Sequence, residues 1–344
     1  MSIEYLPTEI ITQIFLSLHD IASAVALSAT GHRFHTIFHS PQNLVILSAT
    51  AETEFGPLDD IIQLVTQNAS QPAHIHRNVP ISTALIKQVV HVGRVAQRWE
   101  GIYPFKKWRS DYASRRLLIT EERYRVRRAI YRLWLFAKAF HNSSHVRTCR
   151  SIPSVVSTRA ALLQNFSIHD LAEMYDVHQV MREVLRSNTC PSNGRMRVKY
   201  QSRYPDQQHG LMFNIHLNYP PAPSSFIPES WFHNSPSANL SSRNHQPSRW
   251  LDPGAEGWGD DITHYYVVED MLKLDPEQIM HLRDHCPTKA HVETYVKEVG
   301  GEWFGNNGET FNETLSFVVK QRGGEMEELS GSVDDEELGV TAEH

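Results

Sequence analysis

The histidines offer the first candidates for chemistry, because a neutral imidazole is a common ligand of metal ions. The chain has 20 histidines, and His281 and His285 stand four residues apart, next to Cys286. That spacing would place both rings on one face of a helix, where they could share a metal ion. His281 is followed by Leu282 rather than by the glutamate of a zincin motif. The sequence identifies no third or fourth ligand, so we interpret the pair as surface or capping residues and expect no metal site.

Four carboxylates are the second candidates, because clustered carboxylates can transfer protons or bind hard cations. They are Asp260, Asp261, Glu269 and Asp270. Helix capping by Asp260 or Asp261 explains two of them more simply. The sequence contains no Gly-x-Gly-x-x-Gly motif, no P-loop and no Gly-x-Ser-x-Gly motif. We therefore expect no catalytic residue and no cofactor, with a metal- or carboxylate-dependent enzyme as one alternative.

Residues 94–150 carry far more Lys and Arg than Asp and Glu, and aromatic residues such as Trp99 and Tyr112 stand among them. Such a pattern is typical of surfaces that bind phosphate. The whole chain has a formal net charge of -6, which argues against a protein built to hold nucleic acid. We favour a helix surface that pairs with acids elsewhere in the chain. The alternative is a nucleic-acid-associated helical protein in which residues 6–39 form a helix-turn-helix.

Helices must position most of these residues, because apolar side chains recur at a period close to 3.6 through most of the chain. With 344 residues and 40% hydrophobic residues, the chain can bury a sizeable core in two or three domains. The sequence predicts a mainly α fold. The expected helices cover residues 7–18, 22–29, 34–40, 58–68, 82–100, 120–140, 167–187, 262–272, 276–285, 291–299 and 310–321.

The composition predicts five segments. They are an N-terminal three-helix domain at 1–47, a helical region at 58–186, an insertion at 187–257, a C-terminal helical region at 258–322 and a tail at 323–344. The insertion is rich in Ser, Asn and Pro, so we expect a long loop or partial disorder, with a short strand at 212–217. The tail is acidic and contains Gly and Ser, so we expect it to be disordered.

The cysteines are few and widely spaced: Cys149, Cys190 and Cys286. An odd number at such spacing fits a reducing compartment, so we expect a cytoplasmic or nuclear protein. The spacing also differs from that of a RING-type zinc site. We expect no export signal, because the acidic Glu4 stands where a signal peptide would carry basic residues. We expect no membrane segment, because charged residues interrupt the longest apolar stretches.

One ordered motif runs through the first forty-odd residues. Leu6-Pro7-Thr8-Glu9-Ile10 opens it, and it continues with Ile14, Phe15, Leu18, Leu27-Ser28, Phe34 and Ser40-Pro41-Gln42-Asn43-Leu44. Over about residues 5–47 this pattern resembles the F-box family. The chain has Ala29-Thr30 where the family commonly has Val-Cys, and Phe34 where it has tryptophan. Residues 127–140 and 258–276 resemble regions of uncharacterised filamentous-fungal F-box proteins.

The resemblance implies a substrate-receptor subunit of an SCF-type (Skp–cullin–F-box) ubiquitin ligase that is not itself an enzyme. Its partners would be the Skp-type adaptor, through it a cullin ligase, and an unknown protein substrate. By this resemblance the adaptor contacts are Leu6, Pro7, Ile10, Ile14, Leu18, Leu27 and Phe34. Surplus apolar residues on three short helices agree with a docking surface. The alternative is that all seven residues belong to the core of an ordinary helical bundle.

Overall fold

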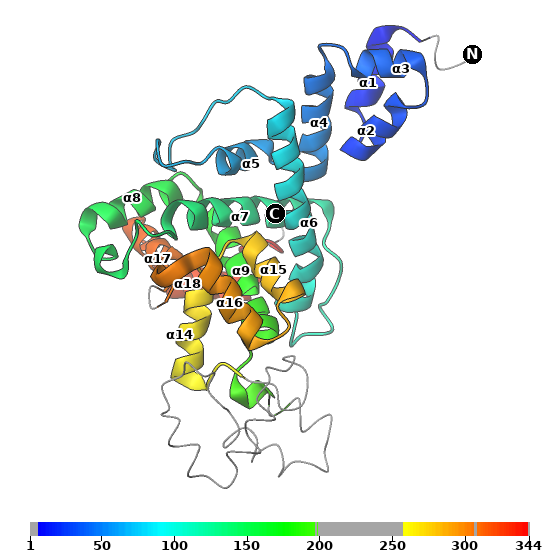
Figure 1. Ribbon diagram of the computed structural model, residues 1–344. Coiled ribbons are helices and arrows are strands. Elements are labelled where there is room, and N and C mark those ends of the chain that lie inside the picture. The colour runs from blue at the N-terminus through cyan, green and yellow to red at the C-terminus, as the bar shows by residue number, and fades with distance from the viewer. Residues whose placement is uncertain (1–5, 197, 199–256, 306–307, 343–344) are drawn as a thin grey trace. The chain divides into compact units, whose positions relative to one another are not determined.

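The computed structural model describes residues 6–196, 198, 257–305 and 308–342. Throughout these ranges the regular structure is helical and contains no strand (Figure 1), which confirms the predicted mainly α fold. The predicted strand at 212–217 and most of the predicted insertion lie outside the described residues. The chain forms two compact units. Unit 1 comprises Met1–His141, Cys149–Val180 and Thr310–His344, and unit 2 comprises Asn142–Thr148 and Met181–Glu309.

Unit 1 begins with three short helices, the N-terminal trio: α1 (Thr8–Leu16), α2 (Ile21–Ser28) and α3 (His32–Phe38). Asp20 starts α2 as predicted, because its carboxylate accepts hydrogen bonds from the Ser23 backbone N–H at 2.6 Å and from the Ser23 hydroxyl at 2.8 Å. The trio is held together by aromatic contacts. The Phe15 ring lies 5.6 Å from that of Phe38 and 6.5 Å from that of Phe34, centroid to centroid.

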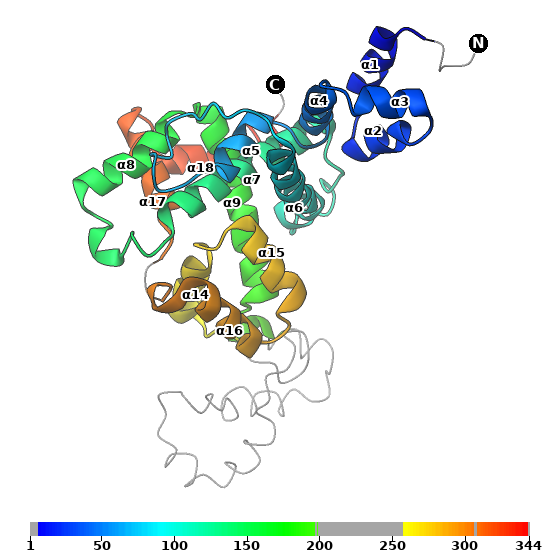
Figure 2. The ribbon, with the colours of Figure 1, turned by 45° about the horizontal axis from the view of Figure 1, so that its top comes forward.

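A fourth helix, α4 (Asn43–Phe55), follows the trio directly and was not expected from the sequence. It runs through residue 47, so the predicted domain boundary there falls inside a helix. Its buried residues Ile46 and Leu47 belong to the same core cluster as the trio. Figure 2 shows α4 (blue) between the trio and the longer α6 (cyan), and α4 packs against both. The first helices are therefore continuous with the rest of unit 1.

The remaining helices of unit 1 include two long ones, which carry three of the largest fully buried side chains. These elements are α5 (Leu58–Val65), α6 (Thr83–Lys107), α7 (Thr120–Phe140), α8 (Pro153–Gln164), α9 (Ile168–Val184), α17 (Phe311–Gln321) and α18 (Met326–Asp334). Trp99 and Tyr103 of α6 and Tyr131 of α7 are almost fully buried. The Tyr131 hydroxyl donates to the Phe55 carbonyl at 2.7 Å, which satisfies the buried polar group.

The C-terminal segment, residues 323–342, corrects the prediction of a disordered tail. It contains α18, and Val333 and Val340 are buried. Backbone carbonyls of the segment accept hydrogen bonds from two cations of unit 1. Lys107 donates to the Val333 carbonyl at 3.0 Å, and Arg125 donates to the Val340 carbonyl at 3.1 Å and to that of Ala342 at 2.7 Å. Acidic composition indicated disorder, but these long-range contacts order the described part of the segment.

Unit 2 is built from the end of α9 and from short helical elements. A π-helical turn, η3 (Leu185–Thr189), follows α9, and later come α14 (Asp261–Met271), α15 (Pro276–His285), α16 (Lys289–Gly300) and the 3-10 turn η5 (Gly301–Trp303). The predicted start of α15 is confirmed. Asp275 accepts from the Gln278 N–H at 2.8 Å, while the Gln278 side chain accepts from the Asp275 N–H at 3.0 Å. None of the helices in the described ranges has the length and apolar run that a membrane crossing needs.

Candidate functional site

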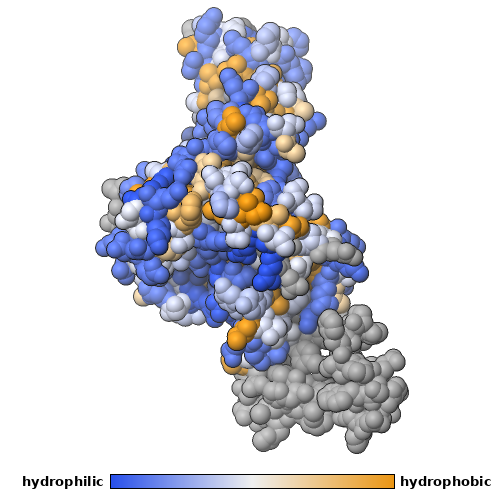
Figure 3. Space-filling model, turned by 90° about the vertical axis from the view of Figure 1, so that its left-hand side faces the viewer, coloured by the Kyte–Doolittle hydropathy of each residue, from blue (hydrophilic) through white to orange (hydrophobic). Residues whose placement is uncertain are grey.

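The N-terminal trio and α4 expose apolar side chains that their own core does not use. Ile10 of α1 is 46% exposed, Val25 of α2 is 50% exposed and Val45 of α4 is 58% exposed. Figure 3 shows apolar atoms (orange) reaching the surface over these first helices. Large exposed aliphatic side chains favour association, because each loses contact with water when a partner covers it. We call Ile10, Val25 and Val45 the apolar set.

Of the residues predicted to contact an adaptor, Pro7, Ile10 and Ile14 keep exposed surface outside the core cluster. Pro7 is exposed, and Ile10 and Ile14 stand four residues apart on the same face of the helix. Ile14 is partly exposed. These three side chains are available to a partner without rearrangement of the core.

The other four predicted contacts serve the core to different degrees. Leu6, Leu18 and Leu27 pack against the core cluster of the trio while they keep part of their surface exposed. Phe34 is only 3% exposed, and its ring packs edge-on against Phe15. The prediction for Phe34 is therefore corrected: its side chain stabilises the trio and presents no surface to a partner.

Residues from later in the chain complete the core of the trio. Ile86 of α6 is buried in the same cluster, and Ile81 and Val90 pack against it. This packing explains why the trio leaves little surplus apolar surface besides the apolar set. The motif gave no signal for Val25 and Val45, because α2 is apolar or small on every face and Val45 follows the last motif residue, Leu44.

Part of the basic segment is neutralised inside unit 1. Three arginines of α7 form ion pairs with acids of α5, α6 and α9: Arg127 with Glu100 at 2.8 Å, Arg128 with Glu173 at 2.6 Å, and Arg132 with Asp60 at 2.9 Å and Asp170 at 2.6 Å. Burial would raise the pKa of Asp170, but the Ser167 hydrogen bonds and the Arg132 charge outweigh it and lower that pKa to about 2. Arginines held by internal carboxylates offer less charge to a phosphate backbone.

The histidine pair of α15 makes a ring contact with a tyrosine of α16. The His281 ring stacks on Tyr295 with centroids 4.4 Å apart, and the His285 ring lies 4.9 Å from that of His281. Cys286 is buried. Within the described ranges, no group of three or more His, Cys, Asp or Glu side chains is placed to hold a metal ion.

Three of the four candidate carboxylates, Asp260, Glu269 and Asp270, make separate contacts. Asp260 precedes the helix, yet its side chain accepts from the Gly194 N–H at 2.9 Å and makes no capping bond to α14. Glu269 forms an ion pair with Arg182 at 2.8 Å. Asp270 accepts from Lys273 at 3.1 Å and from the Gly308 N–H at 2.9 Å. Asp260 therefore joins α14 to the short helical segment at residues 193–196, and the capping interpretation of its side chain is wrong.

Comparison of the chain with protein-family models, with curated proteins and with solved structures found no match. The F-box resemblance thus stays a prediction that rests on the residues from Leu6 to Leu44.

Proposed function

We propose that this protein is a substrate-receptor subunit of an SCF-type ubiquitin ligase, and that the N-terminal trio binds the Skp-type adaptor. The observation that carries the proposal is the apolar set. The motif residues lie on or beside three successive short helices, and Ile10, Val25 and Val45 stay exposed after α4 and α6 have completed the core. Fully covering an exposed Ile or Val side chain is worth about 1.5–3 kcal/mol, so each of these half-exposed side chains contributes about half of that.

The proposed role is that of a substrate receptor rather than an enzyme. The trio would tether the chain to the ligase, and the remainder would hold a protein substrate near the ubiquitin-conjugating enzyme. The gain is a high effective concentration of substrate. Catalysis belongs to the partners, and we place the protein in the cytoplasm or nucleus on the strength of its cysteine pattern.

Binding of the full chain to a purified Skp-type adaptor tests the proposal. Ile10→Asp places a carboxylate on the exposed face of α1, and burying it unpaired against an apolar partner is costly. Because Ile10 is outside the core cluster, the variant should fold like the wild type. We expect the wild type to bind and Ile10→Asp to bind at least about ten-fold more weakly.

Leu117→Asp is the matched control. Leu117 is an exposed leucine of unit 1 between α6 and α7, outside the trio, so its replacement introduces the same charge elsewhere. The control should bind the adaptor like the wild type. The proposal fails if folded wild-type protein does not bind, or if Ile10→Asp and Leu117→Asp bind equally well.

A further inference from the structure

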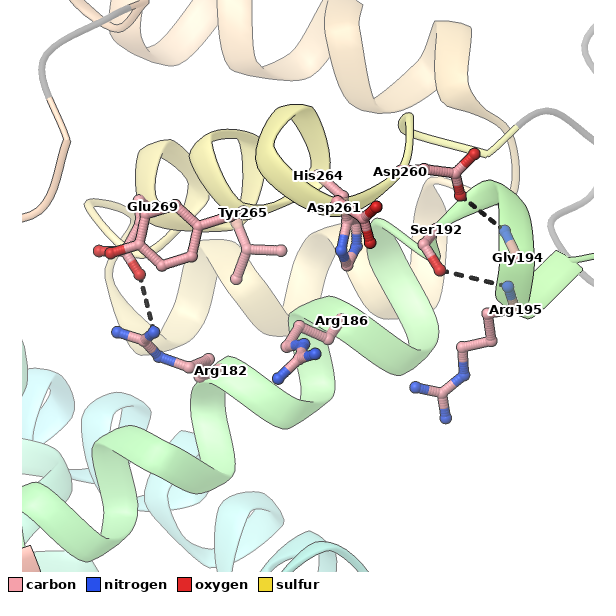
Figure 4. A pocket seen from close by; sticks show the side chains of 11 residues that line it. Arg182, Arg186, Ser192, Gly194, Arg195, Asp260, Asp261, His264, Tyr265 and Glu269 are labelled. Atoms are coloured by element: carbon pink, nitrogen blue, oxygen red, sulfur yellow. Dashed lines mark hydrogen bonds and ion pairs between the residues drawn. The ribbon is translucent and has the colours of Figure 1, made fainter.

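Unit 2 contains a cleft that the proposed adaptor contact does not involve. Its volume is about 460 Å³, and its lining comes from two walls. Figure 4 shows Arg182, Arg186 and Arg195 on the wall formed by the end of α9, by η3 and by the short helical segment at residues 193–196. Helix α14 forms the opposite wall and contributes Asp261 and Tyr265.

The arginine wall carries one uncompensated cation. Arg182 is paired with Glu269 at 2.8 Å, and Arg195 lies 3.5 Å from Glu183. The Arg186 guanidinium is exposed and makes no ion pair or hydrogen bond to any residue that the structure describes. The buried Nε–H of Arg182 also has no hydrogen-bond acceptor among the described residues. This wall therefore offers donors and a single net positive charge to a ligand.

The α14 wall limits how much negative charge the ligand can carry. Asp261 is exposed at the start of the helix and Asp260 precedes it, so both carboxylates would repel a phosphate dianion. One carboxylate matches the single free guanidinium, because the planar fork of arginine binds a carboxylate through two parallel hydrogen bonds. Asp261 can accept hydrogen bonds from N–H groups. A ligand that bridges both walls thus has an acidic side chain and backbone amides, as a peptide does.

Exposed apolar side chains beside the cleft favour a ligand that also has an apolar group. Ile262, Tyr265 and Tyr266 of α14 are each more than half exposed, and the two tyrosine rings lie 5.5 Å apart. Tyr265 also lines the cleft. Exposed tyrosines beside a charged cleft are typical of peptide-binding surfaces, because they bury a large apolar area while the hydroxyl stays solvated.

We propose that this cleft binds a peptide segment with an unphosphorylated Asp or Glu side chain beside an apolar one. The carboxylate is held by Arg186, the peptide N–H groups face Asp261, and the apolar side chain packs on Ile262 and the tyrosines. The identity of the peptide as part of a ubiquitination substrate rests on the proposed function. The binding of a peptide in this cleft does not depend on the proposed function.

Fluorescence polarisation of the full chain with short labelled peptide pools tests the inference. The pools share randomised apolar flanks and differ only in a fixed central residue: glutamate, glutamine or phosphoserine. We expect the glutamate pool to bind most tightly, and Arg186→Gln to weaken its binding about ten-fold or more, because a charged hydrogen-bonded pair is lost. Ile262→Ser should weaken binding about five-fold through lost apolar contact.

Arg283→Gln is the matched control, because Arg283 is an exposed arginine of the same unit on α15, outside the cleft. It should bind the glutamate pool like the wild type. The inference is overturned by any of three results: no saturable binding of the glutamate pool up to about 1 mM, equal or tighter binding of the glutamine or phosphoserine pool, or equal effects of Arg186→Gln and Arg283→Gln. Adaptor binding is measured separately, so failure of the proposed function would leave these results unchanged.

Discussion

Gly339→Ala should destabilise the protein by about 3–5 kcal/mol, because Gly339 holds the C-terminal segment against a buried carboxylate. Its φ of +99° costs an L-residue with a Cβ atom about 1–2 kcal/mol. A Cβ atom on Gly339 would also lie 2.8 Å from Oδ2 of Asp176. That carboxylate is fixed by the Tyr103 hydroxyl at 2.6 Å, by Lys107 at 3.0 Å and by the Val340 N–H at 3.1 Å. Moving it aside breaks at least one hydrogen bond to a charged group, worth about 1.5–3 kcal/mol.

Gly323→Ala separates the backbone effect from the clash. Gly323 has a φ of +83°, and a Cβ atom there would meet nothing within 4 Å. This variant should therefore lose only the backbone term, about 1–2 kcal/mol. Urea unfolding followed by tryptophan fluorescence compares the two variants, since Trp108 donates to Glu336 of the C-terminal segment at 2.7 Å and so reports on its docking.

Two results would refute this account of the C-terminal segment. One is a Gly339→Ala variant that is no less stable than Gly323→Ala. The other is hydrogen exchange at the Val340 amide of the wild type as fast as in an unfolded chain. Either would mean that the contacts of Asp176 do not order the segment in solution.

Three further predictions concern the core, an ion pair and a helix cap, and each is tested by urea unfolding. Phe34→Ala should lower the free energy of unfolding by about 3–5 kcal/mol, whereas Ile10→Ala should change it by less than about 0.5 kcal/mol; equal effects would contradict the burial of Phe34. Asp170 has its pKa lowered from 3.8 to about 2 in the folded state, so its charged form stabilises the fold above about pH 4, and this stability is lost as the pH falls through 2. Asp170→Asn should therefore destabilise the protein by about 1 kcal/mol at pH 7, after allowance for solvent screening, and by much less near pH 2; an effect independent of pH would argue against the ion pair. Asp275→Ala should lower the free energy of unfolding by about 1 kcal/mol, because it removes the cap of α15. Asp275→Asn should keep most of the wild-type stability, because asparagine also caps helices.

Local sequence determined where two of the helices begin, because capping and first-turn side chains bond to backbone groups within a few positions. Asp20 and the Asp275-Pro276-Glu277-Gln278 run predicted helix starts that the structure contains. The mainly α fold likewise followed from an apolar period that repeats through each helix. Composition misled where it stood alone: the acidic residues after Gly323 indicated disorder, yet Leu329, Val333 and Val340 among them are buried.

Only the tertiary structure decided which apolar and charged side chains are available to a partner. Phe34 and Ile10 both belong to the motif, but the first is buried and the second exposed, because α4 and α6 pack against one side of the trio. Arg132 and Arg186 are equally basic, but Asp60 and Asp170 neutralise the first, whereas the second faces an open cleft. Burial and ion pairing depend on residues far away in the chain. A local stretch of sequence does not show which of those residues will become its neighbours in the fold.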